Sequence, residues 1–134
     1  MKIDGRCHCG AIAFEAEVDP ATLSICHCTD CQTLTGSAFR ATIPAAAETF
    51  VLRAGTPKSY IKTTAESGTK RRHAFCPDCG TPIYACAVHA PTRYSLRVGT
   101  IRQRAAFTPC EQSWRRSALG WVNHLAAVPA SETQ

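Results

Sequence analysis

Hydrophobic and polar residues alternate along several short stretches of the chain, and most of these stretches end at glycine or proline. The clearest alternation lies near the N-terminus, where Ile12, Phe14 and Val18 share one face and Glu15 and Glu17 share the other. A period of two residues is typical of a strand with one buried face. The pattern therefore predicts a half-buried strand here.

Further short strands are expected at 23–25, 37–43, 50–52, 59–63, 83–86 and 94–98. Residues 32–36 and 65–70 favour a turn and a loop, and Pro44 should interrupt the strand before it. Many short strands separated by Gly and Pro predict an all-β architecture.

The C-terminal part is different. Residues 111–125 contain Trp114, Leu119, Trp121, Val122 and Leu125 without a clean period, so a short helix and a strand plus turn both fit. The length of 134 residues predicts one domain over 1–134, with a core of about 5–125 and a frayed tail at 129–134.

Composition narrows the class of protein. The net charge of +5 suits anionic partners but does not by itself indicate nucleic-acid binding. The N-terminus lacks a signal-peptide pattern, and no stretch approaches the ~20 apolar residues of a membrane span. Nine cysteines are an odd number, which fits a complete disulfide framework poorly. We therefore expect a cytoplasmic protein with reduced thiols that serve metal or redox chemistry.

Three of these cysteines, Cys26, Cys28 and Cys31, lie within six residues. In an extended backbone Cys26 and Cys28 point the same way, and a turn at 29–30 would bring Cys31 back toward them. Three thiolates form a zinc site that is one ligand short of tetrahedral, and an open position is typical of catalytic zinc. Alternatively, Cys86, Cys110 or a histidine completes a structural site.

A second set is Cys76 and Cys79, which form a C-x-x-C-G zinc knuckle. Cys7 and Cys9 are the natural partners, and together the four thiolates would close a site that ties the N-terminus to the middle of the chain. A redox C-x-x-C pair is the alternative, but it would leave Cys7 and Cys9 without a role.

The remaining candidates are weaker. Cys86 and Cys110 are expected to be small buried hydrophobic residues. The five histidines are expected to be surface or structural residues, and His27 should face away from the metal. Asp30 is expected to be a turn residue, with a role as base or oxygen ligand as the alternative.

The order of motifs resembles that of the glutathione-dependent formaldehyde-activating enzyme family. The motifs are G-x-C-x-C-G at 5–10, C-H-C-x-x-C at 26–31 and F-C-x-x-C-G at 75–80, with Gly-Ser-Ala-Phe at 36–39. The domain of centromere protein V is similar, so the resemblance indicates the fold more firmly than the activity. One departure is Gln32, because an arginine often follows the triad in the family.

The resemblance implies a β-tent-like fold of several small coiled antiparallel sheets and two zinc ions per chain. It implies a structural zinc on Cys7, Cys9, Cys76 and Cys79, and a catalytic zinc on Cys26, Cys28 and Cys31. The implied activity is that of a carbon–sulfur lyase, which joins glutathione and formaldehyde into S-(hydroxymethyl)glutathione.

An open three-thiolate zinc suits this chemistry, since glutathione as fourth ligand would be deprotonated outright. Arg40 and the basic run 70–72 are candidate partners for its carboxylates. The expected partners are glutathione or another small thiol and an aldehyde, with no membrane and no nucleic acid, and the apolar tail makes a homodimer a candidate assembly. The alternatives are a non-catalytic zinc module that binds a protein or nucleic acid, and a zinc-linked redox switch.

Overall fold

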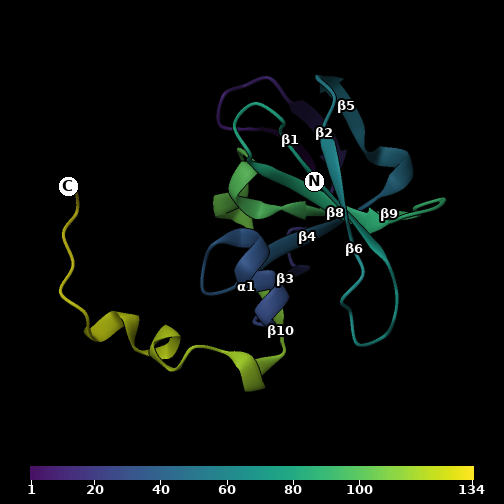
Figure 1. Ribbon diagram of the computed structural model, residues 1–134. Helices are drawn as coiled ribbons and strands as arrows, with labels where there is room; N and C mark the ends of the chain where they lie inside the picture. The colour runs from purple at the N-terminus through teal and green to yellow at the C-terminus, as the bar shows by residue number, and fades with distance from the viewer.

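The computed structural model describes residues 1–134, and most of its regular structure is β-sheet (Figure 1). Two open sheets are formed, with strand orders β1-β2-β5 and β10-β3-β4-β9-β8-β7-β6. Every pairing is antiparallel except that of β10 with β3. The all-β prediction is confirmed. The strands are β1 Lys2–Arg6, β2 Ala13–Glu17, β3 Leu23–Cys26, β4 Arg40–Ala46, β5 Val51–Ala54, β6 Lys58–Lys62, β7 Arg71–Phe75, β8 Pro82–Ala87, β9 Arg93–Arg97 and β10 Pro109–Ser113.

The core lies where the alternating residues of β2 meet one face of the larger sheet. Phe14 is buried and packs against Phe50, with ring centroids 5.6 Å apart, and Phe50 stacks on Tyr94 at 4.5 Å. Gly5 of β1 lies directly against the Phe14 ring, since a Cβ at this position would be 2.2 Å from Cζ. The buried core residues are Ile3, Cys7, Ile12, Phe14, Ala16, Val18, Ile43, Ala45, Cys76, Ile83, Leu96 and Ile101.

The opposite face of the larger sheet is polar. Directly opposed residues in adjacent strands share a face, and so do residues two apart in one strand. Cys26 opposes Arg40, and Thr42 opposes Arg97. Ser95 lies two residues from Arg97 in β9 and opposes Ala85 of β8, and Ala85 opposes His73 of β7. His73 therefore lies on the same face. This face therefore carries one cysteine of the triad beside the half-buried Arg40 and the buried Arg97.

The short helix α1, Thr29–Thr35, corrects the predicted turns at 29–30 and 32–36. Its Asp30 forms an ion pair with Lys62 at 2.9 Å, which connects the helix to β6. The helix ends at Gly36, whose φ of 61° is left-handed and favours glycine. It is the only α-helix, and no helix is long and apolar enough to cross a membrane.

The prediction for Pro44 was wrong. Pro44 lies inside β4, opposite Ser95 of β9, instead of ending a strand. Proline has no N–H to donate to a neighbouring strand. β3 pairs only with residues 40–42 of β4, so no strand lies beside Pro44 on the β3 side to need that donor.

The C-terminal segment continues from β10 into 3-10 helices at Arg115–Ser117 and Gly120–Ala127. It leaves the sheets and extends away from them as a narrow arm (Figure 1). Neither alternative for 111–125 describes the whole segment, because the strand ends at Ser113 and the rest is mostly 3-10 helix. Trp121 and Leu125 are each 55% exposed, so the arm contributes no buried residue to the core.

Candidate functional site

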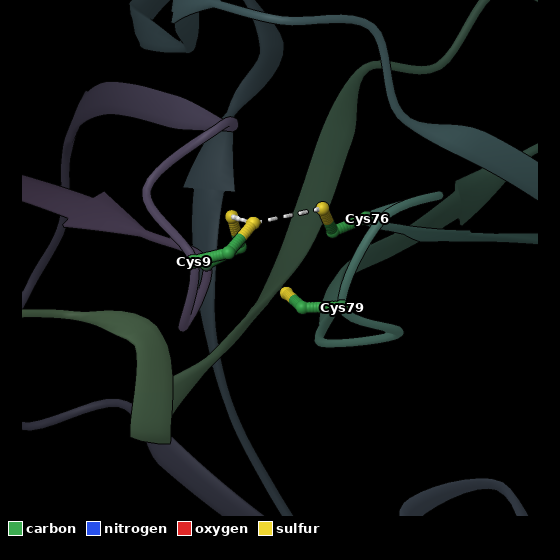
Figure 2. A group of neighbouring side chains, drawn as sticks. Cys9, Cys76 and Cys79 are labelled. Atoms are coloured by element: carbon green, nitrogen blue, oxygen red, sulfur yellow. Dashed lines mark hydrogen bonds between the residues drawn. The ribbon is translucent and has the colours of Figure 1, made fainter.

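The first cysteine cluster joins two loops that are far apart in the sequence. Cys7 and Cys9 lie after β1, and Cys76 and Cys79 lie in the turn between β7 and β8. Figure 2 shows the sulfur atoms of Cys9, Cys76 and Cys79 converging. All four Sγ atoms lie within 4.8 Å of one another, with 3.6 Å from Cys7 to Cys9 and 3.8 Å from Cys9 to Cys76. Tetrahedral zinc with Zn–S bonds of ~2.3 Å places its sulfurs ~3.8 Å apart. The cluster fits a four-thiolate zinc ion and leaves no coordination position open.

Nearby polar groups favour thiolates in this cluster. The backbone N–H of Ile12 donates to Sγ of Cys7 at 3.2 Å. The hydroxyl of Thr81 lies 3.1 Å from Sγ of Cys79, and this hydrogen bond, together with backbone hydrogen bonds from Cys9 and Thr81, lowers the pKa of the Cys79 thiol to about 5. Metal binding requires deprotonated sulfur, so these contacts prepare the site for a cation.

The second cluster is the triad, at the junction of β3 and α1. Cys26 ends β3, Cys28 is the N-cap residue of α1, and Cys31 lies in its first turn. Sγ of Cys28 accepts a hydrogen bond from the backbone N–H of Cys31 at 3.3 Å, so sulfur takes the place of the usual capping oxygen. The three sulfurs lie within 4.8 Å of one another. Cys26 and Cys31 are buried and Cys28 is half-buried, which leaves Cys28 the most accessible.

No fourth side chain completes the triad. No further cysteine, histidine or carboxylate lies within the same distance of these sulfurs. Cys86 is buried in β8, as expected, whereas the expectation that Cys110 is buried was wrong because it lies exposed on β10. Three thiolates with one position left open are the donor set of a zinc site that binds an exogenous ligand.

His27 and Asp30 are occupied elsewhere. Nε2 of His27 lies 2.8 Å from Oε1 of Gln112 on β10, which turns the imidazole away from the sulfurs. Asp30 accepts a hydrogen bond from Thr64 at 2.7 Å and pairs with Lys62. These contacts hold the pKa of the Asp30 carboxyl below its usual value. Asp30 therefore has a structural role in anchoring α1.

Residues 2–117 match the sequence profile of the glutathione-dependent formaldehyde-activating enzyme. The chain belongs to this family. A crystal structure of a Rhodobacter sphaeroides protein aligns with 82% of this chain and 99% of its own, with a TM-score of 0.62 and 22% sequence identity, and supports the fold. No curated protein gives a significant match.

Both cysteine clusters lie inside the region shared with the formaldehyde-activating enzyme family, whereas the arm from residue 118 onward lies outside it. Gln32, which follows the triad, points to backbone carbonyls. Its Nε2 donates to His27 O at 2.8 Å and to Ser117 O at 3.0 Å. Gln32 thus connects the triad loop to the beginning of the arm.

Two arginines flank the triad on the polar face of the larger sheet. Arg40 opposes Cys26 across the β3–β4 pair, and its positive charge opposes the rise in the Cys31 thiol pKa caused by burial. Arg97 is buried, which lowers its pKa to about 10, so the guanidinium stays charged at neutral pH. Arg40 was a candidate from the sequence. Arg97 was not, because nothing in the sequence of its strand indicates that this side chain is buried.

The basic run 70–72 does not act as one group. Lys70 is exposed in the loop before β7, and Arg71 shares the face of His73. Arg72 faces the other way and donates to Ser59 and to Val88 O, both at 3.3 Å. Of the four cations proposed from the sequence, Arg40 and residues 70–72, only Arg40 lies directly opposite a triad cysteine in the strand pairing.

Proposed function

We propose that this chain is a carbon–sulfur lyase of the S-(hydroxymethyl)glutathione synthase type, which joins glutathione or a similar small thiol to formaldehyde or a related aldehyde. The observation that supports it is the triad, whose three sulfurs lie within 4.8 Å of one another with no fourth protein ligand. Membership of the formaldehyde-activating enzyme family supplies the reaction class.

In this proposal Cys26, Cys28 and Cys31 hold a catalytic zinc, which supplies an open position at which a thiol loses its proton. The thiol sulfur forms a bond to the aldehyde carbon, the carbonyl π bond breaks, and the thiol proton ends on the former carbonyl oxygen. Cys7, Cys9, Cys76 and Cys79 hold a structural zinc, so each chain contains two ions. Cysteine-rich metal sites of this kind suit a reducing cytoplasm.

The energetic contribution of deprotonation is modest. A free thiol with a pKa of ~8.5 is only about 3% thiolate at pH 7, so complete deprotonation is worth roughly 2 kcal/mol. A thiol of lowered pKa is also a weaker nucleophile, which offsets part of this gain. Holding the thiol next to the aldehyde contributes more, because orientation can supply several kcal/mol.

The experiment is a titration of the cobalt-substituted protein with glutathione, followed by the thiolate-to-cobalt absorption bands. We expect a saturable change from one of the two metal sites. Cys28→Ser should abolish this change without unfolding the protein, whereas Cys110→Ser, which alters an exposed cysteine outside both clusters, should leave it intact. Bands that do not respond to glutathione would refute the proposal.

A second function is favoured by the arm, whose apolar side chains are exposed and lie outside the family match. Arg116 lies 4.7 Å from the ring centroid of Trp114, so aromatic and basic groups meet at its base. Such a surface suits a protein partner, including a second copy of this chain. Sedimentation of the intact protein and of a form ending at Ser117 tests this, since loss of a dimer upon truncation would assign the arm to assembly.

A further inference from the structure

A large cavity rich in arginine lies next to the four-cysteine cluster, because Cys7 and Thr81 line it together with Arg40. Its volume is about 950 Å³, and none of the triad cysteines lines it. Its walls come from β1, β2, β4 and β9, and from the end of α1. Six arginines line the cavity, namely Arg6, Arg40, Arg53, Arg97, Arg102 and Arg104, against the carboxylates of Asp4 and Glu15.

Both carboxylates are already neutralised by their own partners. Arg53 pairs with Glu15 at 2.6 Å. Arg102 makes hydrogen bonds to both oxygens of Asp4, and these bonds, together with one from Gln103, lower the pKa of that carboxyl to about 2. The other four arginines therefore face the cavity without an acidic partner.

Arg97 is the most unusual of these four, because its side chain is buried and only 5% of the residue is exposed. Its Nη2 lies 3.0 Å from Nδ1 of His73, while Nε and Nη1 are buried without any hydrogen-bond partner. Nε of Arg40 is buried and unpartnered as well. Buried charges and buried N–H donors are normally paired, because an unpaired charge in a protein interior is costly.

The thiolates of the triad do not account for both arginines. Three thiolates around a divalent cation carry a single net negative charge, whereas the guanidinium groups of Arg40 and Arg97 together carry two positive charges. Neither Arg40 nor Arg97 makes a hydrogen bond to sulfur, although both interact electrostatically with Cys31. Both guanidinium groups therefore line the cavity without an acidic side chain to neutralise them, and an anion in the cavity would supply the missing negative charge.

We propose that this cavity binds a small molecule that carries carboxylate or phosphate groups, with Arg97 as the buried anchor and Arg6 and Arg40 as further contacts. Planar guanidinium groups bind such anions through paired N–H donors. Arg6 is exposed at the end of β1 and makes no ion pair, so it is free to meet a second anionic group. The volume also suits a ligand of small-molecule size.

Two sources could supply the anion: the carboxylates of the thiol substrate, or a separate small anion. Two probes distinguish them by calorimetry with the zinc-loaded protein at constant ionic strength. S-methylglutathione carries two carboxylates but has no free thiol, so its binding does not depend on the thiol chemistry proposed for the triad. Inorganic phosphate represents a separate anion.

We expect saturable binding of at least one probe. Binding of S-methylglutathione alone would assign the cavity to the substrate, and binding of phosphate alone would assign it to a separate anion. Arg97→Gln should weaken that binding at least tenfold, since it removes a buried charge-assisted contact. Arg93→Gln is the matched control, because Arg93 is exposed on the same strand, lies outside the cavity and carries the same charge. It should change the affinity less than twofold.

The inference is overturned if neither probe saturates, or if Arg97→Gln and Arg93→Gln weaken binding equally, which would indicate a general effect of net charge. Should Arg97→Gln fail to fold, Arg6→Gln tests the same cavity from its exposed side, and unchanged affinity in that variant would count against the proposal. A protein that binds glutathione in the cobalt titration but neither probe would retain the proposed function and lose this inference.

Discussion

Arg97 donates a hydrogen bond from Nη2 to Nδ1 of His73, 3.0 Å away, and both side chains are buried. Since a guanidinium can only donate, Nδ1 must carry a lone pair, and the imidazole must be neutral. Burial, followed by the positive charges of Arg97, Arg40, Lys62 and Arg71, lowers the pKa of His73 from 6.5 to about 4. His73 therefore holds Arg97 in place only while it remains unprotonated.

Acid should destabilise the protein through His73. Between pH 6.5 and pH 4 the unfolded chain binds a proton at this residue and the folded chain does not, so the free energy of unfolding falls as the pH falls. The full effect is about 3 kcal/mol, because one unit of pKa shift corresponds to ~1.4 kcal/mol. Urea unfolding at pH 7 and pH 5 should show about 2 kcal/mol of this difference. His73→Gln keeps an acceptor for Arg97 but cannot titrate, so its pH dependence should be shallower. Equal slopes in both proteins would contradict this assignment.

Removing one sulfur of the four-cysteine cluster should unfold the protein. Structural zinc contributes about 10–16 kcal/mol in small zinc-binding peptides, which is as large as the stability of a typical domain. We expect Cys76→Ser to lose one of two metal ions and its cooperative unfolding transition, as measured by metal analysis and circular dichroism. Cys110→Ser is the control and should keep both ions. A folded Cys76→Ser protein would show that this cluster is dispensable.

Gln32→Ala should loosen the base of the arm. The change removes the hydrogen bonds to His27 O and Ser117 O, and we expect a loss of about 1–3 kcal/mol in the free energy of unfolding. Hydrogen exchange should become faster around 115–117. Thr33→Ala alters an exposed residue of the same helix and should change stability by less than about 0.5 kcal/mol. Unchanged exchange in Gln32→Ala would mean that other contacts hold the arm.

The strand pattern could be predicted from sequence because one face of each strand meets the core. Ile12 and Phe14 are buried, and Glu15 and Glu17 of the same stretch are exposed, as the alternation required. Helix α1 could not be found in this way. It has only seven residues, three of them threonine, and its N-cap is a cysteine whose sulfur accepts the capping hydrogen bond. Neither composition nor periodicity indicates such a helix.

The cysteine spacing was enough to group the seven sulfurs correctly, since short loops limit where each side chain can point. That the triad lacks a fourth ligand could not be read from the sequence, because it depends on where Cys86, Cys110 and His27 lie in three dimensions. Arg97 escaped prediction for the same reason: in the sequence it is one basic residue at the end of a strand, and its burial results from packing between distant segments.

The four-cysteine cluster also constrains the order of events while the chain is being made. Cys9 and Cys76 are separated by 67 positions, so a ribosome adding about 5–20 residues per second needs on the order of 3–13 seconds between them. During this interval the first two thiols have no partners from the second loop. The nascent N-terminal segment therefore depends on a reducing environment until residue 79 emerges, and oxidative stress during translation would harm this protein more than the same stress applied after the four sulfurs have come together.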